Sequence, residues 1–391
     1  MIQHKGNIMH DKIQENLTQV GFYNRIVTYF VFFILGSGMS LWAILIPYTK
    51  ERLGLNDSQL GSLLMLIGIG AMLAMAVAGK VASRIGCRYA ITLCIFIDIF
   101  VLLNINYVDD IALLCVILVL MGIGVGIADV SVNIQAVFVE NALNKKLMSG
   151  FHSMYSAGGF VCGMLASFML DLGIAIQSVV FIILSAFMLL ALISIKGLTT
   201  SGGESSQAKF VKPSLIVLIC GFVCFVAYMS EGVFLDWSAI FLIEVKGIAR
   251  ESSGYGFSLF FGAITLGRLG GDYLANRFDN AKLIALSAIV AIVGLMIFLF
   301  VPHIWATYIG CIIAGLGISN VIPLIISAIP RIKGNMSLNS AIAAVTTIGY
   351  SGTLLGPALI GYISHTTSLT FALCVIVGLL FIVALVVKKL G

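Results

Sequence analysis

The sequence predicts an all-α integral membrane protein with twelve transmembrane helices in two bundles of six. Three observations support this prediction: the composition, the number of long apolar segments, and a repeat between the two halves of the chain. The chain has 391 residues, of which 60% are hydrophobic and 10% are charged, whereas soluble proteins carry roughly 25% charged residues. Because so few charges cannot cover a soluble surface, most outward-facing side chains must face lipid.

Twelve apolar segments approach the roughly 20 residues that a helix needs to cross a bilayer. Their approximate bounds are 25–48, 58–79, 89–107, 111–138, 149–171, 175–195, 214–243, 254–275, 282–301, 306–329, 338–363 and 368–387. The separators are short and polar except one, which is rich in Gly and Ser as flexible connectors are. We therefore predict a tail at 1–24, a first six-helix bundle at 25–196, a linker at 197–212 and a second bundle at 213–391.

The distribution of Lys and Arg predicts the orientation. With both termini in the cytoplasm, only Lys50, Arg52, Lys246 and Arg250 of the 22 Lys and Arg residues fall outside, and Arg268 is embedded. Cytoplasmic loops of membrane proteins carry an excess of these residues. The distribution thus predicts a multi-pass membrane protein with both ends inside.

The two halves repeat one another. Residues 124–130 (GVGIADV) recur as 315–321 (GLGISNV), with Asn320 in the place of Asp129. Tyr155-Ser156 likewise corresponds to Tyr350-Ser351. Because each half contains six helices, both copies point the same way across the membrane. Such a parallel repeat is typical of alternating access to a site near the midplane.

Residues 79–88 (GKVASRIGCR) resemble the cytoplasmic signature of the major facilitator superfamily. The resemblance extends over essentially the whole chain and implies the major facilitator fold. It also implies conformational roles for Gly79, Arg84, Gly86 and Arg88. The chain departs from the signature at Ser83, where the superfamily usually has Asp, and at Cys87, which is usually basic.

Four segments resemble a bacterial branch of largely uncharacterised permeases: 128–135 (ADVSVNIQ), 151–156 (FHSMYS), Glu231-Gly232 and Asp236-Trp237. That branch is distantly similar to the proton-coupled fucose permeases, which carry carboxylates in helices one and four. Here helix four carries Asp129, whereas helix one carries none. The resemblance implies proton coupling and a place in the bacterial inner membrane, without implying fucose.

Asp129 is the leading candidate for proton coupling, because an embedded carboxylate can couple its protonation to conformation. Asn133 lies one turn further on the same helix face and could hydrogen-bond a polyol. The alternative for Asp129 is a structural bond to a neighbouring helix. Glu231 and His152 are further candidates for the proton site. Glu231 precedes Gly232, which favours a local helix break, and a His near the hairpin could equally be structural.

The remaining candidates fall into two groups. Five residues could contact the substrate: Tyr155, Asn320, Trp42, Trp237 and Tyr350. Each Trp could instead belong to an interfacial aromatic belt. Four residues could act in gating: Asp236, Arg268, Asp272 and Arg277. Arg268 and Asp272 are spaced to pair along one helix face.

We therefore expect secondary active transport of a small polar organic solute, a sugar or related metabolite, by proton symport. The alternative is an exporter of drugs or metabolites by proton antiport, which a more aromatic cavity would favour. We expect no enzyme activity, because His152 and Ser153 are adjacent and point apart on a helix. The sequence contains no GxxxxGK[ST] loop, which argues against ATP as the energy source.

No cysteine pair or Cys/His cluster has the spacing of a metal site. We therefore expect no metal and no cofactor. The expected partners are the solute, protons and the lipid bilayer. The basic excess of +5 is scattered, so nucleic acid is not an expected partner, and we expect a monomer.

Overall fold

Helices make up nearly all of the chain that the computed structural model describes, namely residues 21–201, 213–332, 336 and 338–390. The first half contains α2 (Phe22–Arg52), α3 (Asp57–Asn104), α4 (Ile111–Leu143), α5 (Met148–Asp171) and α6 (Ile176–Ser194). The second half contains α7 (Leu215–Glu244), α8 (Tyr255–Arg277), α9 (Asn280–Phe300), α10 (Ile304–Ile318), α11 (Val321–Ile332), α12 (Leu338–Thr366) and α13 (Leu369–Val386).

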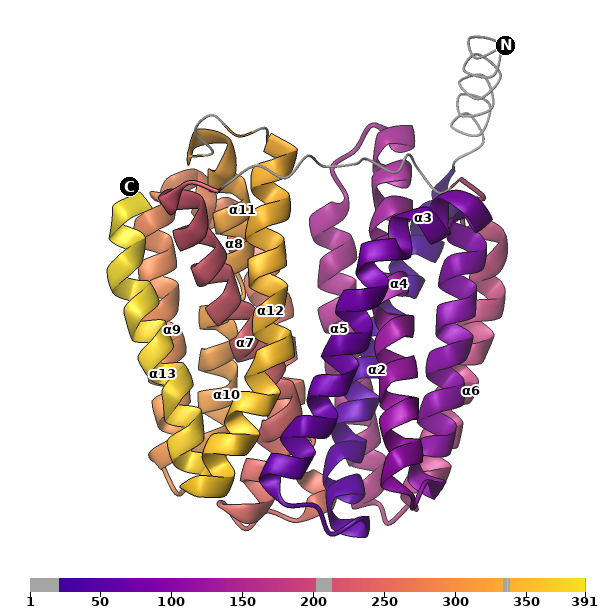
Figure 1. Ribbon diagram of the computed structural model, residues 1–391, viewed down its shortest axis with the longest axis vertical. Helices are drawn as coiled ribbons and strands as arrows, with labels where there is room; N and C mark the ends of the chain where they lie inside the picture. The colour runs from indigo at the N-terminus through magenta and orange to yellow at the C-terminus, as the bar shows by residue number, and fades with distance from the viewer. Residues whose placement is uncertain (1–20, 202–212, 333–335, 337, 391) are drawn as a thin grey trace.

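The two halves form separate bundles that lie side by side (Figure 1). The bundles meet along two main seams, where α3 packs on α12 and α5 packs on α8. The start of α2 and the end of α13 both lie at the upper end of Figure 1, in the right-hand and left-hand bundle respectively. We call this the inner end, which the Lys and Arg distribution assigns to the cytoplasm, and the opposite end the outer end.

The helices are long and apolar enough for the predicted twelve crossings. Ten helical stretches of the described chain are long and apolar enough to cross a membrane, if α10 and α11 are counted together. One of them contains α3, whose 48 residues are divided by a kink at Gly86; at 1.5 Å per residue its two parts have a combined length of about 72 Å, enough to cross a bilayer twice. The more polar α8 supplies the remaining crossing. Within the described chain the all-α class is confirmed.

The connection between the second and third crossings differs from the prediction. The sequence predicts a loop over 80–88, but α3 consists of two helical parts that meet at a sharp kink at Gly86, whose backbone is not helical, with φ at +82°. Glycine adopts this left-handed region at little cost because it has no Cβ. The chain after α6 packs against the turn, since Arg88 N donates to Thr199 O at 2.8 Å and Cys87 N donates to Ser201 O at 3.3 Å.

Replacing Gly86 with Ala should destabilise the protein by about 1–3 kcal/mol, the usual cost of a strained backbone conformation. An added Cβ would also lie 2.3 Å from the carbonyl oxygen of Thr200. The measurement is the apparent unfolding temperature in detergent. Gly79→Ala is the matched control, because nothing lies within 4 Å of a Cβ added there. Equal unfolding temperatures for the two variants would contradict the assigned role of Gly86.

The expected helix break also lies elsewhere. The sequence favours a break at Gly232, yet α7 runs unbroken from Leu215 to Glu244. Gly232 instead allows close packing, because a Cβ there would lie 3.3 Å from Cγ2 of Thr353. The tenth crossing is the interrupted one: α10 ends at Ile318 and α11 begins at Val321. The interruption frees backbone carbonyls in the interior of the second half.

Candidate functional site

The acidic site predicted in the fourth crossing faces the boundary between the two halves. Asp129 lies about 27 Å along α4 from Ile111, at 1.5 Å per residue, which is close to the middle of that helix. The hydroxyl of Tyr350, on α12 of the other half, donates to Asp129 Oδ2 at 3.1 Å. Asn133 Nδ2 donates to the Asp129 carbonyl oxygen at 2.8 Å and lies 3.5 Å from Oδ1. Three predicted site residues are therefore brought together.

A second polar cluster centres on Arg268 of α8. Its Nη2 forms an ion pair with Glu231 Oε1 of α7 at 3.2 Å, and its Nη1 donates to Ser156 Oγ of α5 at 2.8 Å. Its Nε donates to the Ser319 carbonyl at 3.4 Å, a group freed by the interruption after α10. The described ion-pair partner of Arg268 is thus Glu231. The predicted pairing with Asp272 stays a prediction, because the Asp272 side chain lies outside the described ones.

Two tyrosines lie between the clusters. The rings of Tyr228 and Tyr350 stack with their centroids 4.8 Å apart, and Tyr228 precedes Glu231 by three residues on the same face of α7. The Tyr155 phenol lies within electrostatic range of Asp129, Glu231 and Arg268. The two clusters therefore belong to one polar region that extends across both halves.

Sequence reasoning missed two members of this region, Tyr228 and Ser156. Tyr228 could have been found from its i,i+3 spacing to Glu231. Ser156 follows the predicted Tyr155 but carries no signal of its own, because a serine in an apolar helix is common. Only the approach of Arg268 from the other half identifies Ser156.

His152 lies apart from Asp129. Its ring meets the ring of Phe32 edge-on, with centroids 5.2 Å apart, and it lies within electrostatic range of Arg268. No hydrogen bond joins His152 to Asp129 in the described structure. The histidine is therefore placed beside the Arg268 cluster.

Three residues predicted to contact a substrate are buried. Trp42 and Trp237 are 2% and 0% exposed, and Trp237 Nε1 donates to the Pro357 carbonyl at 3.2 Å. Such burial does not fit an interfacial belt, and a contact with the substrate stays a prediction. Asn320 is 8% exposed, and its Nδ2 donates to the Gly267 carbonyl at 2.8 Å. This bond connects the segment between α10 and α11 to α8, so the amide nitrogen of Asn320 is already engaged within the protein.

The predicted gating residues are dispersed. Arg84 and Arg277 are exposed, and the Arg277 guanidinium lies 5.0 Å from the centroid of the Tyr273 ring. Arg88 Nε donates to the Leu198 carbonyl at 3.0 Å. Asp236 is partly buried about two turns before the end of α7. These positions do not form a single gate in the described structure.

The outer end is closed by contacts between the halves. Lys50 of α2 pairs with Glu244 of α7, and Arg250 pairs with Glu51. Tyr255 OH donates to Asp171 Oδ2 at 2.7 Å. Further contacts join α3 to α12: a hydroxyl pair between Ser62 and Tyr362 at 2.9 Å, and a bond from Ser364 to Asp57. This arrangement separates the polar region from the outer side.

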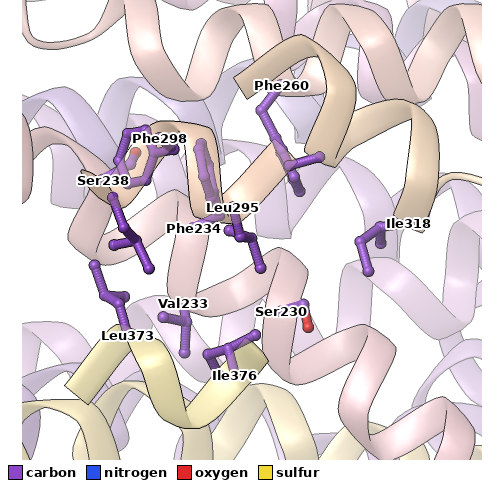
Figure 2. A pocket seen from close by; sticks show the side chains of 12 residues that line it. Ser230, Val233, Phe234, Ser238, Phe260, Leu295, Phe298, Ile318, Leu373 and Ile376 are labelled. Atoms are coloured by element: carbon purple, nitrogen blue, oxygen red, sulfur yellow. The ribbon is translucent and has the colours of Figure 1, made fainter. Parts of the chain in front are cut away.

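Figure 2 shows a cavity that is distinct from this region. It lies inside the second half between α7, α8, α9, α10 and α13, and side chains such as Phe234, Phe260 and Phe298 line it. Its volume of about 20 Å³ is sufficient for a single water molecule. The cavity is therefore a packing void and too small for a metabolite.

Comparisons with known proteins agree over nearly the whole chain. A model of the Major Facilitator Superfamily matches residues 28–332 and 220–390. An uncharacterised MFS-type transporter of Yersinia pestis is 39% identical over 96% of this chain and 98% of its own. The membrane protein MosC of Rhizobium meliloti is 29% identical over 91% of this chain and 87% of its own. A crystal structure of a mutant of the nucleoside transporter NupG has a TM-score of 0.74 at 13% identity, covering 94% and 98% of the two chains.

Proposed function

Because the chain belongs to the Major Facilitator Superfamily and is a membrane transporter, we propose that it carries a small polar organic solute by proton symport. The solute class is a sugar or a related metabolite, and the mechanism is alternating access between the two halves. Asp129 is the proton site in this proposal. The polar region around Asp129 and Arg268 is the solute site.

The observation that carries the proposal is the environment of Asp129. Its hydrogen-bond partners are the neutral groups of Asn133 and Tyr350, so no ion pair among the described residues fixes its charge. Burial without a counter-charge disfavours the ionised form of a carboxylic acid. A carboxyl group in this setting can exchange a proton as its surroundings change, which is what coupling requires.

The second cluster supports a neutral, hydroxyl-bearing solute. Arg268 and Glu231 neutralise each other while remaining 16% exposed, so together they offer both donors and acceptors. An anionic solute would have to compete with Glu231 for the embedded guanidinium. The cargo named for the structural neighbour NupG, a nucleoside, is also a neutral solute with hydroxyl groups.

The test has two steps. A thermal-shift screen of the purified protein against sugars, nucleosides, amino acids and organic acids identifies a ligand, because binding to the folded state raises its stability. That ligand is then added to de-energised cells in weakly buffered medium. Symport predicts that the medium becomes alkaline in cells with the transporter and not in cells without it. Acidification would indicate antiport, and uptake without any pH change would contradict proton coupling.

A further inference from the structure

Asp129 receives hydrogen bonds from two side chains of different origin. Asn133 belongs to the same helix, so its amide stays beside Asp129 however the halves are arranged. Tyr350 belongs to α12 in the other half, and its hydroxyl donates to Asp129 Oδ2 at 3.1 Å. One donor is therefore permanent, whereas the other depends on the positions of the two halves.

The arrangement that brings Tyr350 to Asp129 is the one with a closed outer end. The same helix, α12, closes that end through the bond of Tyr362 to Ser62 and of Ser364 to Asp57. Alternating access requires one half to rotate against the other, so that this seam opens. Opening of this seam moves α12, which carries Tyr350, relative to α4, which carries Asp129.

We infer that Tyr350 is the proton-release residue for Asp129. This inference rests on the proposed function, in which Asp129 is the proton site. While the outer end is closed, the phenol donates to the carboxylate and stabilises its ionised form. The proton then leaves Asp129 Oδ2 for water on the inner side, and Tyr350 keeps its own proton. When the outer end opens, the donor is lost and the carboxyl group is free to bind a proton from the outer side.

No charged side chain forms a hydrogen bond or an ion pair with Asp129 in the described structure, so the donor that can change is Tyr350. Asn133 faces it from α4, Tyr155 from α5, Tyr228 from α7 and Tyr350 from α12. All four are neutral near pH 7. The charged pair of Arg268 and Glu231 and the carboxylate of Asp98 lie within electrostatic range of Tyr155. The ring of Tyr228 stacks on Tyr350 and holds the phenol in the position from which it donates.

The inference can be tested without a known solute, because the ligand is the proton. Infrared spectra of the full-length protein are recorded across a pH series, and the carboxylic-acid band that Asp129→Asn removes is assigned to Asp129. In Tyr350→Phe this band should persist to a pH about one unit higher than in the wild type. That shift is the lower end of what losing a hydrogen bond to a charged group produces.

Tyr362→Phe is the matched control. It removes a hydroxyl bond between the halves from the same helix, α12, but that hydroxyl bonds Ser62 and not Asp129. Because the bond of Ser364 to Asp57 still holds the outer seam closed in this variant, its Asp129 band should titrate as in the wild type. If Tyr350→Phe also matches the wild type, the inference is overturned. If Asp129→Asn removes no band that titrates, the proposed proton site itself is wrong.

A second variant tests the dependence on the outer end and does not alter Tyr350. A Cβ on Gly361 would lie 2.4 Å from the Asp57 carbonyl oxygen, so Gly361→Trp should prevent the outer seam from closing. The Asp129 band should then persist to higher pH by a similar amount. Adding Tyr350→Phe to Gly361→Trp should shift it no further. A further full shift would show that Tyr350 acts on Asp129 in both states, which contradicts the inference.

Discussion

Asp129→Asn should abolish the accumulation of solute driven by a proton gradient while leaving exchange of solute across the membrane largely intact. The amide preserves the size of the side chain and its ability to meet Tyr350, but it cannot gain or lose a proton. One proton moving through 100 mV supplies about 2.3 kcal/mol, which corresponds to a roughly 40-fold concentration ratio. In the variant this ratio should fall to about one.

Both processes are measured in the same proteoliposomes: uptake driven by an imposed proton gradient, and counterflow against preloaded solute. Asp98→Asn is the matched control, because it neutralises another embedded carboxylate, which packs against Gly124 of α4. We expect this control to accumulate solute normally. Full proton-driven accumulation by Asp129→Asn would transfer the proton site to Glu231 or His152.

The second large effect is a loss of stability on replacing Arg268, because the carboxylate of Glu231 then has no ion-pair partner. Arg268→Gln should destabilise the protein by about 2–3 kcal/mol, somewhat below the cost of breaking a fully buried ion pair, because Glu231 remains partly exposed. Arg250→Gln removes the partner of Glu51 at the outer end, where the side chains are 34% and 63% exposed. That variant should lose at most about 1 kcal/mol. Chemical unfolding in detergent measures both.

A double-mutant cycle separates the pairing from other effects of the substitution. Combining Arg268→Gln with Glu231→Gln removes both charges, so most of the lost stability should return. Solute binding should not return, because the solute site then lacks both the guanidinium and the carboxylate. Strictly additive losses of stability would contradict the ion pair. Normal binding by the stabilised double variant would remove these two residues from the proposed solute site.

The interruption of the tenth crossing shows where local reasoning fails. A glycine after a charged residue favours a break at Gly232, but that glycine contacts Thr353 within an intact helix. The actual interruption lies after Ile318, where Pro323 has no N–H for the carbonyl of Ser319 and the Asn320 amide donates to the Gly267 carbonyl of α8. Helix propensity is a weak local preference, and packing against a neighbouring helix overrides it.

The ion pair of Arg268 illustrates the same limit. The spacing of Arg268 and Asp272 is suitable for pairing along one helix, and the sequence offers no reason to prefer a partner on another helix. The observed partner, Glu231, is 37 positions away, and the serine that Arg268 also contacts is 112 positions away. A charged side chain inside the membrane pairs with the opposite charge that helix packing places beside it, even when that charge is distant in the sequence.

The sequence by itself determined the all-α class, the repeated halves and the position of Asp129 in the fourth crossing. It could do so because a bilayer leaves a chain few choices: the backbone must satisfy its own hydrogen bonds, so apolar segments of about 20 residues become helices. The partner of Asp129 became visible only in the fold. Tyr350 is 221 positions away, and the contact exists because the two halves pack against each other, which no local pattern encodes.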